Sequence, residues 1–221
     1  MKFDIITIFP EIFSSYFNES IIKKAQEKKI IKINVHNLRD FTNDKRHTVD
    51  DTIYGGGAGM LIKIEPLYKA IKKIAKKKKT SGQKIILLSA KGKKWNQELA
   101  KKYSKLKNIT LICGRYEGVD DRIKNFIDEE ISIGDYILTG GEIGAMTIVD
   151  SIARLIPKVL GNNESLIDES HNSKNILEYP QYTKPAEFKV ESKKYNVPKV
   201  LLSGNHKLIE NWKEKNKKRV K

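Results

Sequence analysis

One stretch of the chain reads 109-ITLICGRYEGVDDR-122: an apolar run, a turn with two glycines, and the start of a helix-like segment that continues to about 127. The same order recurs at 84-KIILLS-89, where a glycine-containing turn leads to a helix-like segment at roughly 94–105. Short apolar runs bounded by glycine are typical of buried strands. Strands that alternate with helices predict an α/β fold with a mostly parallel sheet, covered by helices on both faces.

The flanking sequence adds two strands and two helices to this pattern. The run 3-FDIITIF-9 is rich in β-branched residues, and apolar residues alternate with polar ones over 31–35. Apolar residues at helical spacing predict one helix over 12–21 and another within 142-EIGAMTIVDSIARLIP-157, which ends at its proline. Because open α/β sheets bind their ligands at the carboxyl ends of the strands, the turns that follow the strands are the expected site.

The composition indicates a globular protein that attracts polyanions. Its 221 residues suffice for one sizeable domain, or for one domain with a small appendage. The 43 Lys and Arg against 27 Asp and Glu give a net charge of +16, which favours RNA, DNA or an anionic membrane as a partner. A general lysine bias of the genome would explain the charge as well, so the charge alone decides nothing.

Cys113 is the only cysteine, which excludes an internal disulfide and fits a reducing compartment. We expect it to be a small buried residue rather than a nucleophile, since no histidine stands in a partner motif. The histidines lack the spacing of metal ligands, so no metal site is expected. There is no apolar run of roughly 18 residues and no secretory signal pattern, which predicts a soluble, cytoplasmic protein.

A change in composition after residue 160 predicts two units. The segment 161–175 is polar and is interpreted as a flexible linker. The remainder, 176–221, is small and basic and ends in a helix-like segment that begins near Asn205. The lysine-rich stretch 72-KKIAKKKKT-80 is most simply a solvated helix end and loop.

The first glycine-rich motif is 50-DDTIYGGGAGM-60. Four glycines within five residues let the backbone adopt positive φ and approach a ligand closely. Loops of this kind hold phosphates, so a nucleotide site is one interpretation. The motif lacks the Lys-Ser or Lys-Thr of a phosphate-binding loop and the G-x-G-x-x-G spacing, and a purely structural loop is the alternative.

The second motif, 113-CGRYEGVDDR-122, directly follows an apolar strand. Arg115, Tyr116 and Glu117 offer a cation, an aromatic ring and a carboxylate within one short turn. Glu117 is suited to accept hydrogen bonds from an amine or a ribose hydroxyl, and Tyr116 to stack on a base. The alternative is that the acidic pair after this turn merely caps a helix.

The third motif, 132-SIGDYILTGGE-142, is a strand interrupted by Gly134, followed by two glycines that open a helix. The free backbone groups of such a loop are able to read an adenine edge. Glu142 at the helix start is favourable with the helix dipole whatever the function. Three glycine-bearing loops, each after a strand, predict one shared pocket.

In this order, the three loops closely resemble those of the bacterial tRNA (guanine-N1)-methyltransferases, the SPOUT-superfamily enzymes that modify the guanine 3′ of the anticodon. The resemblance runs along nearly the whole chain. The matching segments are 39-RDFT-42, 48-TVDDTIYGGGAGM-60, 113-CGRYEG-118, 128-DEEISIGDYILTGGE-142, 157-PKVLG-161 and 199-KVLLSGNH-206.

The resemblance implies a knotted catalytic domain over 1–160, the linker 161–175, and a small helical tRNA-binding domain over 176–221 that is short for the family. The C-terminal part of the first domain would thread through a trefoil knot, which general connection rules argue against. The implied methyl donor is S-adenosylmethionine, and the implied partners are tRNA and a second copy of the chain, with active sites shared between the subunits. Neither DNA nor a membrane is expected as a partner.

By the same resemblance, the knot loops hold S-adenosylmethionine in a bent shape, largely through backbone contacts. The positions that match these contacts are Leu88, Ser89, Gly92, Gly114, Tyr116, Glu117, Ile133, Gly134, Asp135, Tyr136, Ile137, Leu138, Gly140 and Gly141. The positions that match contacts with the RNA substrate are Asp50, Gly59 and Arg154. The family needs Mg²⁺ for activity, and Asp50, Glu117 and Glu169 are carboxylates able to attract it, although no dedicated site is visible.

The reaction needs a general base, because guanine N1 carries a proton at neutral pH, and a cation to stabilise the charge that shifts to O6. In the family the base is an Asp of the linker, held by a Ser and assisted by an Arg. Arg154 matches the Arg and Ser170 the Ser. The Asp falls on Glu169, with Asp168 just before it. We favour Glu169 as the base, with Asp168 after a register shift as the alternative.

Two other functions stay open. A SPOUT enzyme for another RNA target or a 2′-hydroxyl would share the cofactor loops, but the YGGGAGM loop and Ser170 match the guanine-N1 enzymes. A non-catalytic tRNA-binding module would result if Glu169 had abolished catalysis. That module predicts tRNA binding without a cofactor and no methyl transfer.

Overall fold

The computed structural model describes residues 1–75, 82–161, 170 and 176–219. The chain divides into two compact units, Met1–Gly161 and Asn162–Lys221. In the part of the chain that the structure describes, no helix combines the length and hydrophobicity that a membrane crossing requires.

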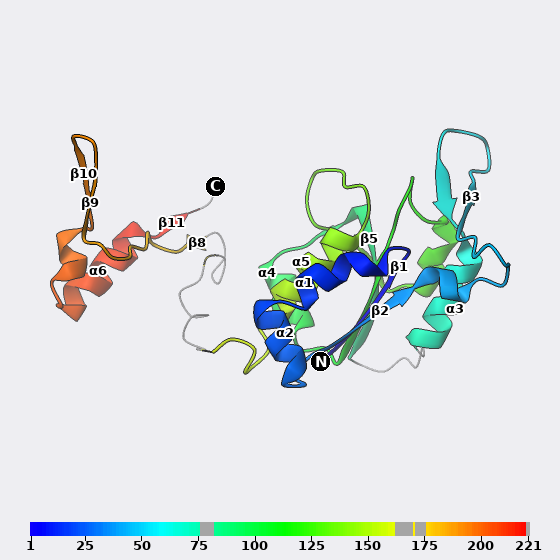
Figure 1. The fold of residues 1–221 in the computed structure, drawn as a ribbon, viewed down its shortest axis with the longest axis horizontal. Helices are drawn as coiled ribbons and strands as arrows, with labels where there is room; N and C mark the ends of the chain where they lie inside the picture. The colour runs from blue at the N-terminus through cyan, green and yellow to red at the C-terminus, as the bar shows by residue number, and fades with distance from the viewer. Residues whose placement is uncertain (76–81, 162–169, 171–175, 220–221) are drawn as a thin grey trace. The chain divides into compact units, whose positions relative to one another are not determined.

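A five-stranded sheet of order β2-β1-β6-β5-β7 forms the centre of the first unit, and every neighbouring pair of its strands is parallel (Figure 1). The predicted α/β class with a mostly parallel sheet is therefore confirmed. The strands are β1 (Lys2–Thr7), β2 (Lys32–Asn37), β5 (Gln83–Lys94), β6 (Asn108–Cys113) and β7 (Glu129–Ser132).

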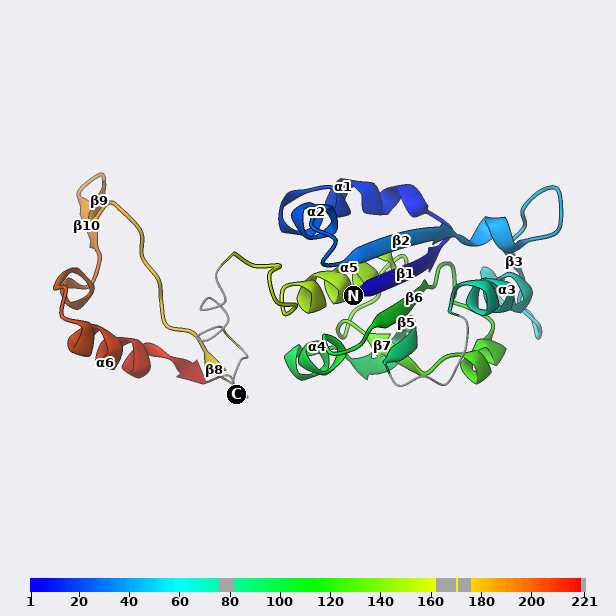
Figure 2. The same ribbon diagram turned by 90° about the horizontal axis from the view of Figure 1, so that it is seen from below.

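Helices cover both faces of this sheet. Figure 1 shows α1, α2, α4 and α5 on one side and α3 on the other, and Figure 2 shows α1 and α2 beside β1 and β2. Alternate residues of β1 enter two separate cores: Phe3 and Ile5 pack with Ile148 of α5, and Ile6 packs with Leu67 of α3. The helical elements are η1 (Pro10–Phe13), α1 (Ser14–Phe17), α2 (Ser20–Glu27), η2 (Leu38–Phe41), α3 (Ile64–Ile74), α4 (Gln97–Tyr103), η3 (Asp121–Phe126) and α5 (Glu142–Ala153).

Three predicted elements differ from the structure. β5 continues past Ser89 to Lys94 and pairs with β7 on both sides of an irregularity, so that Ile131 of β7 lies opposite both Leu88 and Lys93. The interpretation of 132–142 as a strand interrupted by Gly134 is wrong, because β7 ends at Ser132. The segment after the second motif is the short 3₁₀ helix η3, not an α-helix.

The glycine-rich motif forms the tip of an antiparallel hairpin. Its strands are β3 (Asp50–Thr52) and β4 (Met60–Ile62), with Asp50 opposite Ile62 and Thr52 opposite Met60. Four glycines of the tip have positive φ, which an L-residue with a side chain rarely adopts. The glycines therefore allow the tight turn of a defined hairpin, and the motif is not an unstructured loop.

The second unit is mixed in secondary structure, whereas the sequence predicted a helical one. Beside η5 (Lys199–Leu202) and α6 (His206–Asn216), it holds the pair β8 (Ile176–Leu177) with β11 (Lys218–Arg219) and the hairpin β9 (Glu187–Val190) with β10 (Lys193–Asn196). The hairpin escapes prediction because Glu191 supplies the positive φ of its turn, where Gly or Asn is the usual signal. The predicted start of the last helix is confirmed, since the Asn205 side chain caps α6.

Candidate active site

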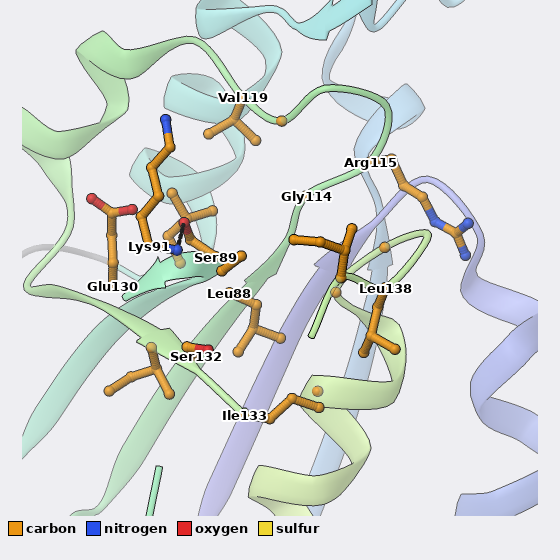
Figure 3. A pocket seen from close by; sticks show the side chains of 18 of the residues that line it. Leu88, Ser89, Lys91, Gly114, Arg115, Val119, Glu130, Ser132, Ile133 and Leu138 are labelled. Carbon is orange, nitrogen blue, oxygen red and sulfur yellow. Dashed lines mark hydrogen bonds between the residues drawn. The ribbon is translucent and has the colours of Figure 1, made fainter. Parts of the chain in front are cut away.

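A pocket of about 510 Å³ lies at the carboxyl ends of β6 and β7 and beside the irregularity that follows Leu88 in β5 (Figure 3). This volume falls within the roughly 300–1,000 Å³ of small-molecule sites. Three segments build it: 87–91, 114–124 and 130–144. The sequence predicts one pocket shared by three glycine-bearing loops. The second and third loops do share it, together with the end of the apolar run at 84–89, but the first loop, 50–60, contributes no lining residue.

Twelve of the fourteen expected cofactor positions line this pocket: Leu88, Ser89, Gly114, Tyr116, Glu117, Ile133, Gly134, Tyr136, Ile137, Leu138, Gly140 and Gly141. Gly92 and Asp135 do not. Gly92 sits where β5 approaches β7, and a Cβ there would lie 2.4 Å from the backbone nitrogen of Ile131. Asp135 is exposed and pairs with Lys94.

One wall of the pocket is apolar. Leu88 and Ile133 both approach Gly144 on the first turns of α5, where a Cβ would lie 3.4 Å from Leu88 Cδ1 and 3.6 Å from Ile133 Cγ2. Figure 3 shows Leu88, Ile133 and Leu138 on this side of the pocket. An uncharged planar group would fit such a wall.

Charged side chains that the sequence does not assign to the site also line the pocket, among them Asp121, Lys124 and Glu130. Lys124 on η3 forms ion pairs with Asp121 at 2.6 Å and with Glu130 of β7 at 3.3 Å. These partners raise the pKa of Lys124 and keep it cationic. No signal in the sequence links η3 to β7, because their contact depends on the β5–β7 pairing.

The second loop is fixed by the β3–β4 hairpin. The Glu117 N–H donates to Met60 O at 3.2 Å, and the Ile62 N–H donates to Gly118 O at 3.1 Å. Tyr116 within this loop has a φ of 59°, a conformation that costs a residue with a side chain about 1–2 kcal/mol. Tyr116 lines the pocket, so the strain occurs at the site itself.

A buried ion pair joins the second and third loops. Arg115 Nε donates to Glu142 Oε2 at 2.9 Å, and the hydroxyl of Thr7 donates to Glu142 Oε1 at 2.8 Å. The backbone completes the connection, since the Gly141 N–H donates to Gly114 O at 2.9 Å. The sequence indicates only a helix-dipole role for Glu142, because its bond with Thr7 joins residues far apart in the chain.

The expected catalytic residues are less fully described. Arg154 is the half-buried C-cap residue of α5 and does not line the pocket. Ser170 is half-buried, and its hydroxyl accepts a hydrogen bond from the Glu178 N–H at 3.1 Å. Asp168 and Glu169 lie outside the described residues.

Two of the three expected substrate positions, Asp50 and Gly59, lie on the β3–β4 hairpin. Asp50 is half-buried at the start of β3. Gly59 is exposed in the tip and has a φ of 90°. Neither residue lines the pocket, but the hairpin that carries them contacts the loop that does.

No three His, Cys, Asp or Glu side chains within the described ranges are grouped as metal ligands. Cys113 is buried, as expected, and burial raises the pKa of its thiol well above the ordinary value, so it stays protonated.

The family model of the "tRNA (Guanine-1)-methyltransferase TrmD" matches residues 1–221. A protein named tRNA (guanine-N(1)-)-methyltransferase from Dictyoglomus turgidum is 54% identical over 215 residues, which cover 97% of this chain and 84% of the relative. The protein of the same name from Carboxydothermus hydrogenoformans is also 54% identical, over 97% of this chain and 82% of that relative. The protein of the same name from Clostridioides difficile is 49% identical over 100% of this chain and 94% of that relative. The chain therefore belongs to the tRNA (guanine-1)-methyltransferase TrmD family.

Proposed function

We propose that this chain transfers a methyl group from S-adenosylmethionine to N1 of the guanine 3′ of the anticodon in tRNA. The match of the family model along residues 1–221 carries the proposal. The net charge of +16 suits a polyanionic substrate. Because the substrate is tRNA, the reaction would take place in the cytoplasm.

The pocket at the ends of β6 and β7 and beside the irregularity of β5 fits the methyl donor. Its apolar wall at Leu88, Ile133 and Leu138 suits an adenine ring, and the Glu117 carboxylate suits a ribose hydroxyl or an ammonium group. At Gly141 the third loop approaches the start of the second loop so closely that a Cβ on Gly141 would lie 2.8 Å from Cys113 Cα. S-adenosylmethionine, when bound, supplies a methyl group on a sulfonium centre.

The residues of the chain have three roles in the proposed reaction. A carboxylate of the linker, Glu169 or alternatively Asp168, removes the N1 proton as the new bond to carbon forms. Ser170 holds that carboxylate, and the guanidinium of Arg154 stabilises the negative charge that moves toward O6. Asp50 and Gly59 position the RNA, and Mg²⁺ would be attracted by Asp50, Glu117 and Glu169.

The proposal includes a homodimer with shared active sites. Arg154 follows the end of α5, whose first residue, Glu142, lies beside the pocket. Twelve residues of helix separate them by about 18 Å along its axis. A second copy of the chain is the natural source of an arginine for this pocket.

Exposed apolar side chains near the start of the chain and on α5 support the same conclusion. Phe9, Ile12, Tyr16 and Ile143 are between 38% and 58% exposed, and α5 packs against η1. A cluster of this kind favours burial against another protein surface.

The proposed domain organisation follows the family. A knotted S-adenosylmethionine-binding domain would occupy 1–160, a linker 161–175 and a tRNA-binding domain 176–221. The linker falls almost entirely outside the described residues. The double pairing of β7 with β5 is a feature of the segment that would form the knot.

Transfer of labelled methyl from S-adenosylmethionine tests the proposal. Two tRNA transcripts, one with guanine and one with adenine 3′ of the anticodon, are incubated with the wild type, Glu169→Ala and Asp168→Ala. We expect label on the guanine transcript alone, and loss of that label in Glu169→Ala. Survival of label in Glu169→Ala but not in Asp168→Ala would move the base to Asp168. Binding of tRNA with no transfer to either transcript would refute the proposed reaction.

A further inference from the structure

Glu142 is a buried carboxylate that holds three separate segments of the chain together. Glu142 is only 1% exposed, and it does not line the pocket. One carboxylate oxygen accepts from the Thr7 hydroxyl at the end of β1, and the other accepts from Arg115 of the second loop. Glu142 itself begins α5, directly after the third loop.

Further contacts lock each partner of this carboxylate. The Thr7 oxygen also accepts from the Phe9 N–H at 3.0 Å, which ties it to the turn after β1. The guanidinium of Arg115 lies over the Phe9 ring, 4.8 Å from its centroid, and donates to Thr139 O at 3.3 Å. Figure 3 shows the Arg115 side chain directed away from the pocket that its backbone borders.

An acidic residue in the first turn of a helix is stabilised by the helix dipole alone, and needs no partners for that. Glu142 differs because both oxygens are engaged by donors from other elements, one of them 135 residues away. Removing one donor, or the charge, would leave a buried polar group unsatisfied. The contacts thus fix how far apart the second and third loops stand.

The geometry points to Glu142 as a positioning residue for the methyl donor, with Thr7 and Arg115 as the groups through which it acts. This inference rests on the proposed function. A pocket whose loops are held in place before binding does not lose affinity to loop ordering. The carboxylate would therefore contribute to S-adenosylmethionine affinity without touching the ligand, and would leave tRNA binding unaffected.

Calorimetric titration of the full chain with S-adenosylmethionine tests the inference, together with thermal unfolding and the KM for each substrate. Glu142→Gln keeps the size of the side chain but loses the charge. We expect its Kd for S-adenosylmethionine to rise by about tenfold, the change that corresponds to one charge-assisted hydrogen bond. The KM for S-adenosylmethionine should rise in parallel, and the KM for tRNA should stay unchanged.

Asp4→Asn is the matched control. Asp4 is as buried as Glu142, lies on β1 like Thr7, and bonds to Lys2, His36 and Asn34, none of which lines the pocket. It should lower the melting temperature and leave the Kd for S-adenosylmethionine at the wild-type value. An equal loss of affinity in Asp4→Asn at an equal loss of stability would overturn the inference, as would wild-type affinity in Glu142→Gln.

Thr7→Val and Thr7→Ser decide the matter if Glu142→Gln does not fold. Valine keeps the shape of threonine but removes the donor, so Thr7→Val should weaken binding, and Thr7→Ser should restore it. Equal affinities in the two variants would refute a role for the hydroxyl and with it the inference. If the wild type itself binds no S-adenosylmethionine, the proposed function fails first, a result distinct from a variant that matches a binding wild type.

Discussion

The carboxylate of Glu117 lies directly against Gly59: a Cβ on Gly59 would be 1.9 Å from Glu117 Oε1. This contact joins the glycine-rich hairpin to the loop that borders the pocket. The N–H of Glu117 is already held by Met60 O in the same hairpin. The hairpin therefore controls where the Glu117 carboxylate points.

Gly59→Ala should displace this carboxylate. We expect kcat/KM for methyl transfer to fall roughly 10- to 100-fold, because displacing a positioned group by about 1 Å is costly. The φ of 90° at Gly59 adds strain of about 1–2 kcal/mol, which thermal unfolding would register. Steady-state kinetics with the guanine tRNA transcript measures the main effect.

Gly55→Ala separates strain from displacement, since its φ is 87° but nothing lies within 4 Å of its Cβ. An equal loss of activity in both variants would argue against displacement of Glu117.

Gly140→Ala should disturb the ion pair between Arg115 and Glu142. The added Cβ would lie 2.2 Å from Arg115 Nε and 2.6 Å from Glu142 Oε2, so that one partner must move. We expect the Kd for S-adenosylmethionine, measured by calorimetry, to rise about tenfold. Gly161→Ala, where nothing lies within 4 Å of the Cβ, should leave that Kd unchanged. Wild-type affinity in Gly140→Ala would contradict the idea that this ion pair shapes the pocket.

The sequence predicted the parts of this fold that local patterns determine. The apolar runs at 84–89 and 109–113 became the central strands β5 and β6, and the helix within 142–157 became α5. Where parallel strands are buried on both faces they are nearly continuous apolar runs, so this pattern is strong. The second and third glycine motifs correctly marked loops that line the pocket, whereas the first forms a hairpin that borders the second loop without lining the pocket.

What the sequence could not predict depends on contacts between distant segments. β5 continues through charged residues to Lys94 only because β7 pairs with it there. The bond between Thr7 and Glu142 spans 135 residues and has no local signature. The close approach of β5 to Ile131 at Gly92 likewise has no local signature.

The buried carboxylate of Asp4 predicts a loss of stability in acid. Burial raises its pKa, but hydrogen bonds with His36, Lys2 and Asn34 outweigh burial and place the pKa below its ordinary value of 3.8. Because the folded pKa is lower than the unfolded one, the stabilisation is complete above the unfolded pKa and is lost as pH falls through the folded pKa. Urea unfolding of Asp4→Asn should show a deficit of about 1–3 kcal/mol at pH 6 that shrinks toward pH 3. A deficit independent of pH over this range would show that the carboxylate charge is not what stabilises the fold.

Arg154 and the pocket should belong to one active site only when they come from different chains. Arg154 ends α5, about 18 Å along the helix from Glu142, and it does not line the pocket of its own chain. With S-adenosylmethionine held at no more than the wild-type Kd, Arg154→Ala and Gly140→Ala should each be poorly active alone, the first with normal S-adenosylmethionine binding. When the two variants are co-expressed with different affinity tags and purified as the mixed dimer, one of its two sites combines an intact pocket with an intact Arg154. We therefore expect up to half of the wild-type methyl transfer to return, since only that site is complete. If each site were built from a single chain, both sites of the mixed dimer would be defective, and its activity would not exceed the mean of the two parent variants.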